Sequence, residues 1–590
     1  MKKTLLLPLS TKTADTQALT NAIRSWLAPL PDEFDFIFLH DLPWSDDWLT
    51  PRDSLFAEMT GEYQRMGDCL FERLTETLQL DVPKALFISI IGTWLYNSMS
   101  SLLEMYKLCT ACPEHLAMAN AFVLSFPSAA LPAHNSVDCT EIYAGSTLRL
   151  AVFGEIATKL GIQCVHIPQN ALPRFQKPNL RRQFTAFDAF TKNWLLENIY
   201  NFFTATLGAL FGGPQVIADS HRMASAIFSL KHKTFPTIIN LKLSLLFKRR
   251  WDAALRQRML SAPHSNNTDF SKIVLWLIPH LMPAALLENN LQQLTAVQQP
   301  KTGPPSAIFS FNNHTGAQLA LKQLQEGPST KRVTVTHGGG YGIDGVIPEE
   351  LTDNAISHSI FTFGWPTQNN TIHFKPDFLT AIHLHRSRWS ADSGGRFAMV
   401  GSSSPHYSYK LCGGPISPIQ VNTYFVDQQQ FYIDLGPSLA NQFVHRPHPS
   451  RYGHLQERWF KTGTHPDLSV KLYDGAGFNC LSYELLVMDY IGTTLTIRAL
   501  ANLPFLFYCR PEWWPINPVA AETIARLKQV GVWHATPTSA ADFLKKISGD
   551  ISEWWTAKET ATAVSSFRRN YCGSDSPSLA AAAGAFLSTV

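Results

Sequence analysis

Strands that alternate with helices constrain the fold of this chain more than any other feature of its sequence. The stretch SAIFSFN (Ser306–Asn312) is a short apolar run typical of a buried strand. The next segment, TGAQLALKQLQEG, begins at a capping threonine and ends at a glycine, as helices do. A second strand, KRVTV, follows it. Such strand–helix–strand units form parallel strand pairs with helices on the faces, so the pattern predicts an α/β fold.

A second series of such units begins near Arg396. The strand-like runs RFAMV, NQFVHR, ELLVMD and LPFLFY alternate there with helical segments. We expect three parts along the chain. Residues 1–390 form an N-terminal α/β domain with helical insertions, residues 396–550 form a C-terminal α/β domain, and residues 551–590 form a helical tail that packs back on the N-terminal domain.

Composition excludes several protein classes. The chain has 590 residues, of which 45% are hydrophobic and 16% charged, so we expect a globular protein. Its net charge of +3 gives no reason to expect a nucleic-acid partner. The start MKKTLLLPLS is typical of a buried strand rather than a secretory signal, so we expect a cytoplasmic location. The apolar segment Lys84–Leu103 contains Asn97 and several serines, which favours a buried helix over a membrane span.

The segment HGGGYG directly follows the strand KRVTV. Glycine leaves the backbone bare, which permits sharp turns and the close approach of a ligand. Ligands of parallel sheets bind beyond the carboxyl ends of the strands. The sequence therefore places a candidate ligand loop at His337, Gly338, Gly339, Gly340 and Tyr341.

Three further strand ends carry polar residues that suit an anion. The loop HRPHPS holds Arg446 and His448 between stiffening prolines. The segment MDYIGTT places Thr493 and Thr494 at a predicted helix N-terminus, where backbone amides attract anions. The loop GSSSPHYS, which includes Ser403, is a weaker signal. Each segment alone also fits a surface loop or a simple helix cap, but their occurrence in consecutive units favours a phosphate site.

Common nucleotide and metal motifs are missing from the sequence. No GxxxxGK[ST] occurs, and GGGYG lacks the acidic partner of a dinucleotide-binding loop. No Asp-x-Asp is placed to hold a metal beside a diphosphate. Cys109 and Cys112 form a CxxC without a second ligand pair. We therefore expect neither a metal nor a bound cofactor.

The basic stretch LKLSLLFKRRWDAALRQRML (Leu241–Leu260) has two interpretations. Apolar residues at helical spacing among lysines and arginines suit peripheral contact with the anionic surface of the inner membrane. The pattern is also typical of a partly exposed helix with a basic face, which we favour.

Several segments together resemble a bacterial family of surface-carbohydrate transferases. The similar segments are HGGGYG, FTFGWP (Phe361–Pro366), GTTLTIRALANLPFLFY followed by PEWW, and ISIIGTWLYNSMSSLLEMY, which matches the family's GPWL region around Trp94. The chain departs from the family pattern at Thr336, where glutamine is usual, and at Ile497, where glutamate is usual. Thr93 stands in place of the proline of GPWL.

The His-Gly, His-Pro and Ser/Thr elements are also similar to those of GT-B transferases that use cytidine-activated donors, such as capsule Kdo transferases, sialyltransferases and teichoic-acid polymerases. This resemblance implies two Rossmann-like α/β domains that face a cleft, with a helix-rich N-terminal part. It implies that the first domain holds the acceptor and the second the donor nucleotide. The donor would then be held by Arg446, His448, Pro449, Thr493, Thr494 and Ser403, and the acceptor would contact Gly338, Gly339, Gly340, Tyr341 and Trp94.

From these features we expect a metal-independent GT-B glycosyltransferase of surface-polysaccharide biosynthesis. It would move an ulosonic acid (Kdo, or a nonulosonic acid like sialic acid) from a CMP donor to a surface-glycan or protein acceptor. His337 would deprotonate the acceptor hydroxyl, a task that suits an imidazole near neutral pH. Alternatively His337 is structural or contacts the donor, and the base is an acid such as Asp344, Glu349 or Glu350. Two other functions stay open: a CDP-polyol phosphotransferase, and a non-catalytic nucleotide- or glycan-binding protein.

Overall fold

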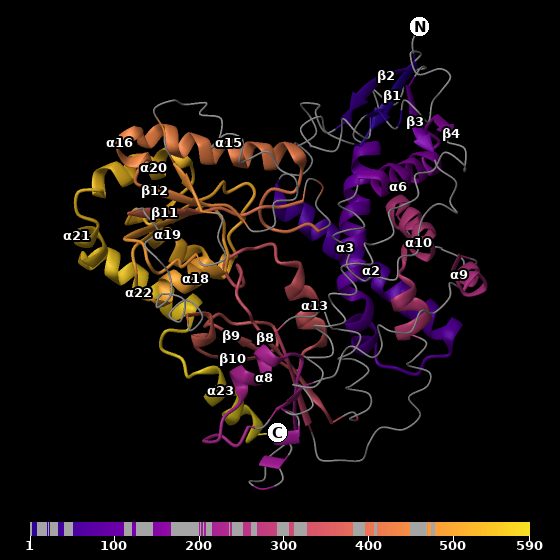
Figure 1. The fold of residues 1–590 in the computed structure, drawn as a ribbon. Coiled ribbons are helices and arrows are strands. Elements are labelled where there is room, and N and C mark those ends of the chain that lie inside the picture. The colour runs from indigo at the N-terminus through magenta and orange to yellow at the C-terminus, as the bar shows by residue number, and fades with distance from the viewer. Residues whose placement is uncertain are drawn as a thin grey trace.

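Three parallel sheets and the helices around them make up the described part of the protein in the computed structural model (Figure 1). The structure describes residues 3–8, 20–21, 23, 34–39, 51–110, 121–125, 146–166, 200, 202–204, 206–207, 210, 215–234, 236–238, 252–260, 268–291, 306–311, 327, 329–380, 396–405, 407, 410–448, 468, 470–473 and 478–589. The mixed α/β class and the helix-rich N-terminal part expected from the sequence are both confirmed.

The first sheet, here called the N-terminal sheet, has the strand order β2-β1-β3-β4 and only parallel pairs. Leu5, Leu6 and Leu7 are fully buried, so the apolar start of the chain forms a core strand as predicted. The strands are β1 (Lys3–Leu7), β2 (Phe34–Phe38), β3 (Ala121–Ser125) and β4 (Cys164–His166).

Two long helices connect this sheet to the rest of the molecule. They are α2 (Arg52–Leu78) and α3 (Lys84–Thr110), which pack against each other. The apolar window of α3 is long enough to cross a membrane, but 94% of it is buried inside the protein, which confirms the predicted core helix. The helices around this pair are α6 (Ser146–Lys159), α9 (Ala253–Leu260), α10 (Asp269–Leu281), the π-helix η7 (Ala285–Leu291) and α13 (Pro348–Ile356).

The middle sheet has the order β10-β9-β8-β7-β5-β6, again with parallel pairs throughout. The predicted strands on either side of the predicted helix are adjacent, as expected for a strand–helix–strand unit; residues 312–326 between them lie outside the described residues. The strands are β5 (Gln215–Ala218), β6 (Thr237–Ile238), β7 (Ser306–Ser310), β8 (Lys331–Val335), β9 (Ser359–Thr362) and β10 (Asn370–His373), and α8 (His221–Ile227) follows β5.

The C-terminal sheet has the order β13-β12-β11-β14-β15-β16 and is also parallel. Its strands are β11 (Phe397–Val400), β12 (Phe443–Arg446), β13 (Lys471–Leu472), β14 (Leu485–Met488), β15 (Phe505–Tyr508) and β16 (Trp533–His534). The helices that accompany it are α15 (Pro418–Leu435), α16 (Pro437–Ala440), α18 (Thr493–Leu500), η8 (Pro518–Ala520), α19 (Ala521–Gln529), α20 (Pro537–Ile547) and α21 (Ile551–Thr556).

Local sequence explains where the longest of these helices begins. The hydroxyl of Ser417 accepts the N–H of Gln420, and Pro418 occupies the first turn, where no N–H is needed.

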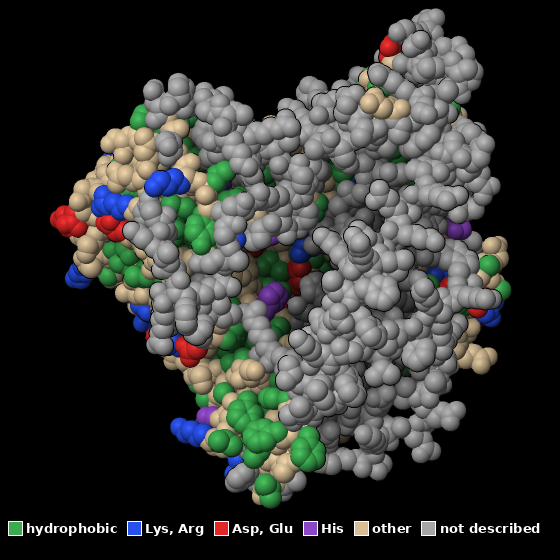
Figure 2. All heavy atoms as spheres, in the orientation of Figure 1, with side chains coloured by type: hydrophobic (Ala, Val, Ile, Leu, Met, Phe, Trp, Pro, Cys, Tyr) green, Lys and Arg blue, Asp and Glu red, His purple; other side chains and the backbone are tan. Residues whose placement is uncertain are grey.

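The predicted linker near residues 385–396 lies mostly outside the described residues. The surface is hollowed between the C-terminal sheet and the N-terminal helices, and histidine, acidic and basic side chains are visible in the hollow (Figure 2).

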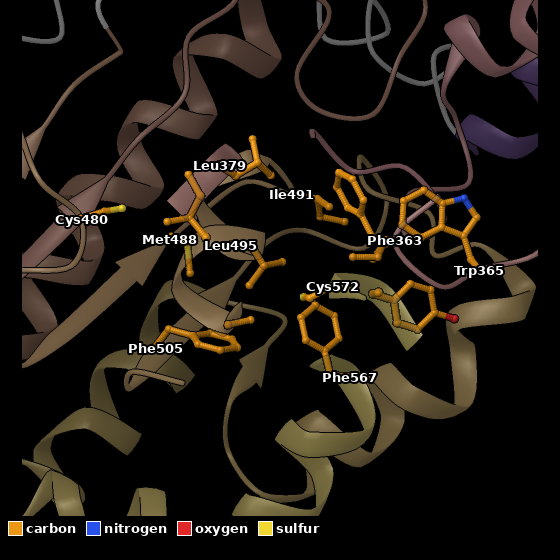
Figure 3. Close-up of a cluster of buried hydrophobic side chains, with 14 of the residues drawn as sticks. Phe363, Trp365, Leu379, Cys480, Met488, Ile491, Leu495, Phe505, Phe567 and Cys572 are labelled. Carbon is orange, nitrogen blue, oxygen red and sulfur yellow. The ribbon is translucent and has the colours of Figure 1, made fainter. Parts of the chain in front are cut away.

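The last two helices touch both six-stranded sheets. The first, α22 (Lys558–Cys572), packs on α18 and α19, while α23 (Leu579–Leu587) packs on α8. The ring of Phe586 lies 6.1 Å from that of Phe309 and 5.9 Å from that of Phe361. One hydrophobic cluster runs through this region, and Figure 3 shows its residues Phe363, Trp365, Ile491, Leu495, Phe567 and Cys572 close together.

The expected domain boundaries stay a prediction. The described part of residues 1–390 holds two separate sheets.

Candidate active site

A cavity of about 300 Å³ lies where the long N-terminal helices, the middle sheet and the C-terminal sheet meet. The residues that line it come from α3, from the loop after β8 with the start of α13, and from loops of the C-terminal sheet. They include Thr93, Tyr96 and Asn97 of α3; His337, Gly339, Gly340, Tyr341, Asp344 and Glu349 near β8; and Ser402, Lys410, Gly413, Tyr490, Ile491 and Trp514 of the C-terminal part. Because parallel sheets bind ligands beyond their strand ends, this cavity is the candidate active site.

The glycine loop after β8 directly contacts the start of α18. The N–H of Gly339 donates to Oγ1 of Thr493 at 2.9 Å. Gly338 has a φ of +125°, and a Cβ built there would lie 2.5 Å from the same Oγ1. Only glycine fits this approach and this backbone conformation. The structure therefore brings together the histidine–glycine loop and the threonine pair that the sequence predicts as two halves of one site.

His337 directly precedes the three glycines of the loop and lines the cavity. Its Nδ1 is 2.8 Å from the carbonyl oxygen of Phe311, and its ring makes an edge contact with Tyr341 at 5.7 Å. A carbonyl oxygen can only accept a hydrogen bond, so Nδ1 carries the proton. In the neutral ring this leaves the lone pair on Nε2, which is the tautomer required for a base that acts through Nε2.

Asp344 is the most deeply placed acid of the cavity. It is 4% exposed, and its Oδ1 accepts the N–H of Val346 at 2.9 Å. Burial raises the pKa of this carboxyl to about 8, with a further increase from Glu350. A side chain at Gly413 would overlap the second carboxylate oxygen, so the glycine makes room for the acid. With this pKa, Asp344 is mainly protonated at neutral pH and can donate a hydrogen bond.

An ion pair joins the two sides of the cavity. Nζ of Lys410, in a loop of the C-terminal part, lies 2.6 Å from Oε1 of Glu349 at the start of α13. Both side chains are about a quarter exposed and both line the cavity. The pair therefore links the start of α13 to the C-terminal part across the cavity.

A buried hydrogen-bond network supports the loop after β11. The carboxylate of Asp489 accepts from the hydroxyl of Tyr424 at 2.7 Å and from the side-chain amide of Gln428 at 2.6 Å. The Tyr424 oxygen in turn accepts the N–H of Ser402 at 2.6 Å. Burial raises the pKa of Asp489 to about 7. The sequence analysis missed this network, although an aspartate that directly follows a buried apolar strand is a sequence feature that could have indicated it.

Two other residues predicted to hold the donor substrate, Arg446 and Thr494, lie at the end of β12 and in the first turn of α18. Arg446, at the end of β12, donates from Nη1 to the Tyr473 carbonyl at 3.4 Å, and its guanidinium lies 5.9 Å from the rings of Tyr473 and Phe478. The hydroxyl of Thr494 is 3.0 Å from that of Tyr490, a residue that lines the cavity.

Four further residues of these loops have different outcomes. Ser403 and His448 are partly exposed, whereas Pro449 lies outside the described residues. His445 is fully buried beside Tyr432, and burial lowers its pKa to about 3, so this histidine is neutral and structural.

One predicted acceptor contact needs correction. The sequence predicts Trp94 in the site, but the structure buries it in the core of the N-terminal part with 3% exposure. Helix α3 is buried on most of its surface, so the sequence did not reveal which side faces the cavity. Thr93, Tyr96 and Asn97 line the cavity instead.

The two departures from the family pattern lie in the protein interior. Thr336 is 4% exposed and Ile497 is 5% exposed. Ile497 belongs to the hydrophobic cluster between the sheets. Both side chains therefore contribute to packing, and the cavity lining does not include them.

The basic stretch of residues 241–260 is described only from residue 252 onward. Arg256 is buried there and pairs with Glu288 at 2.7 Å, and it donates to the carbonyls of Pro279 and Met282. This guanidinium fixes α9 to the neighbouring helices rather than facing lipid. Membrane contact by the stretch stays a prediction.

A model of the family described as LIC12162 family transferase matches residues 39–578. The chain belongs to this transferase family. No curated protein matches the chain. Among solved structures, the crystal structure of α,α-trehalose 6-phosphate synthase from Burkholderia multivorans is similar, with 11% identity and a TM-score of 0.30, over 55% of this chain and 78% of that chain. A likeness at this level is too weak to support an inference about the activity of this LIC12162 family transferase.

Proposed function

We propose that this transferase moves a sugar, an ulosonic acid of the Kdo or sialic type, from a CMP donor to a hydroxyl of a surface-glycan or protein acceptor. The observation that carries the proposal is the contact between the glycine loop after β8 and Thr493 at the start of α18, beside a cavity lined from both sides. A reaction that joins two substrates needs such a shared cavity, where closure excludes water.

The C-terminal side of the cavity suits the donor phosphate. The N-terminal amides of α18 and its dipole favour an anion, and the resemblance to cytidine-donor transferases assigns Thr493 and Thr494 to the same task. Arg446 would add a cation at the end of β12, two strands away from β14 in the same sheet. These groups would stabilise the charge that develops on CMP as the bond between the sugar and the phosphate oxygen breaks.

The other side suits the acceptor. His337 would take the proton of the attacking hydroxyl on Nε2 while the new bond forms between that oxygen and the anomeric carbon. Protonated Asp344 would donate a hydrogen bond to the acceptor. The base role of Asp344 named above as an alternative needs the ionised form, which its raised pKa disfavours at neutral pH. We place the reaction in the cytoplasm, at or near the inner membrane.

Nucleotide binding tests the donor. A thermal-unfolding series with CMP, UMP, GMP and AMP should show the largest stabilisation with CMP. A ligand at about 100 times its Kd stabilises the folded state by about 2.7 kcal/mol. An equal or larger shift with a purine nucleotide would contradict the cytidine donor. Turnover of CMP-Kdo and CMP-sialic acid, followed as CMP release, separates sugar transfer from transfer of a polyol phosphate and from binding without catalysis.

Chelation tests metal independence. The proposed site neutralises phosphate with protein groups, so we expect CMP release to continue in EDTA at an unchanged rate. Loss of activity that magnesium or manganese restores would show that a metal assists the leaving group.

A further inference from the structure

Three adjacent strands of the middle sheet are linked where they end. Asp219 directly follows β5, Phe311 directly follows β7, and His337 follows β8. These strands are neighbours in the order β8-β7-β5. Since parallel strands end at the same edge of a sheet, the three residues lie in a row beside the cavity.

Hydrogen bonds connect the row from end to end. Oδ2 of Asp219 accepts the N–H of Phe311 at 3.0 Å, and the Phe311 carbonyl is 2.8 Å from Nδ1 of His337. The backbone N–H of Asp219 donates to the carbonyl of Phe309 at 3.0 Å. Its other carboxylate oxygen accepts from Ser220 at 2.8 Å. Asp219 is 7% exposed, so these bonds form in a site with little water.

We propose that Asp219 is a positioning residue for His337, a role that rests on the proposed function of His337 as base. By accepting the N–H of Phe311 and donating its own backbone N–H to the carbonyl of Phe309, Asp219 fixes the end of β7 and with it where the Phe311 carbonyl points. That carbonyl then holds the imidazole in the tautomer with the proton on Nδ1 and the lone pair on Nε2. Asp219 acts through a backbone segment and does not itself touch the substrate.

The choice of residue at 219 supports this role. Burying a carboxylate is unfavourable unless hydrogen bonds compensate it. A bond from a backbone N–H to a charged oxygen is shorter and stronger than one to a neutral oxygen. Asp219 therefore holds the Phe311 segment more firmly than a neutral side chain would. A firm hold on this segment matters to a catalytic group beside it, because misplacing such a group by about 1 Å costs up to about 100-fold in rate.

The first measurement is the tautomer of His337 in the full-length protein. Histidine labelled with ¹⁵N reports which ring nitrogen carries the proton, and a His337→Gln variant assigns the signal. We expect the wild-type ring in the Nδ1–H form. In Asp219→Ala we expect a mixture of both tautomers. Asp219→Asn can still accept from Phe311 through its amide oxygen but without the charge, so its signal should lie much closer to that of wild type than the signal of Asp219→Ala, and it serves as the conservative rescue.

A matched control separates this role from helix capping. Ser220→Ala removes the hydroxyl that donates to Asp219 and caps α8, but it leaves the bond to Phe311 in place. We expect its His337 signal to match that of wild type. An equal change of tautomer in Ser220→Ala, or a wild-type signal in Asp219→Ala, would overturn the proposal.

Kinetics then link the tautomer to turnover. Asp219→Ala should lower kcat by about 10- to 100-fold with little change in the KM for the donor. An inactive wild-type protein with every CMP-sugar would contradict the proposed function, while the ¹⁵N signals would still decide whether Asp219 positions His337. A normal kcat in a variant with mixed tautomers would show that the tautomer does not matter to the base.

Discussion

Single side chains give the cavity and the hydrogen-bond network beside it an unusual proton balance. Asp344 has its pKa raised to about 8 and Asp489 to about 7, both by burial, so neither carboxyl is fully ionised at neutral pH. Nδ1 of His337 is bonded to the backbone carbonyl of Phe311. The resulting site can accept a proton on imidazole and offer one from a carboxyl group. Such paired opposite roles are typical of sites that perform acid–base chemistry.

Removing the imidazole tests the base. His337→Ala should lower turnover by about 10²- to 10⁴-fold, the usual contribution of a positioned base, with CMP affinity nearly unchanged. His358→Ala is the control, because His358 precedes β9 and so lies at the opposite edge of the same sheet. Rates and thermal unfolding should be measured on the same samples. A folded His337→Ala protein with most of its wild-type rate would rule out the base role.

Asp344 should make stability depend on pH. Its folded pKa of about 8 lies above the ordinary value of 3.8, so the folded state binds the proton more tightly than the unfolded chain. The free energy of unfolding therefore falls as the pH rises from about the ordinary value to about 8, by up to about 1.4 kcal/mol per pH unit from this group. Asp344→Asn should remove this part of the slope. Urea unfolding at several pH values measures it, and identical slopes for both proteins would contradict the raised pKa.

Strand ends and the loops after them were the elements best predicted from the sequence. The strands β7, β8, β11, β12 and β14 depend on local apolar runs, and the glycine and threonine segments follow them as expected. Side chains that act from a neighbouring helix were missed, because sequence patterns do not show which helix face meets which loop. Tyr424 of α15 reaches Asp489, and Tyr96 of α3 reaches the cavity, through packing that involves distant parts of the chain.

The contact between the glycine loop and α18 can be tested with two alanines. Gly338→Ala puts a Cβ 2.5 Å from Oγ1 of Thr493, whereas a Cβ at Gly339 meets nothing closer than 3.5 Å. Both positions have a positive φ, so both variants share a strain of about 1–3 kcal/mol. Gly338→Ala should lose about 1–3 kcal/mol more, the usual cost of overpacking. Equal losses in urea unfolding would show that the loop and α18 separate easily.

At the scale of the whole molecule, the C-terminal helices unite the two six-stranded sheets. Helix α22 packs on the C-terminal sheet's helices and α23 on the middle sheet's α8. Composition and periodicity predicted a helical tail, but three sheets rather than two were not foreseen, because β1 and β2 alone do not reveal their partners. Strand pairing across long stretches of chain depends on the tertiary structure, which short sequence windows do not contain.

Phe586 measures how much the tail contributes. Its ring is 6% exposed and packs against Phe309 and Phe361, so Phe586→Ala should cost about 3–5 kcal/mol. Val519→Ala is the matched control, because Val519 is 58% exposed and its truncation should change stability by less than about 0.5 kcal/mol. Thermal unfolding compares them. A loss for Phe586→Ala no larger than that for the control would mean that the middle sheet is stable without the tail.

The position of Phe586 also affects how the protein is made. Strands β7 and β9 leave the ribosome well before Phe586, whose ring covers their Phe309 and Phe361. Until Phe586 emerges, the aromatic surface of these strands lacks its cover, so the middle sheet reaches its final packing only after that residue has been made. Ribosomes that stop between β9 and Phe586 would release chains with an exposed aromatic patch, which chaperones and proteases bind.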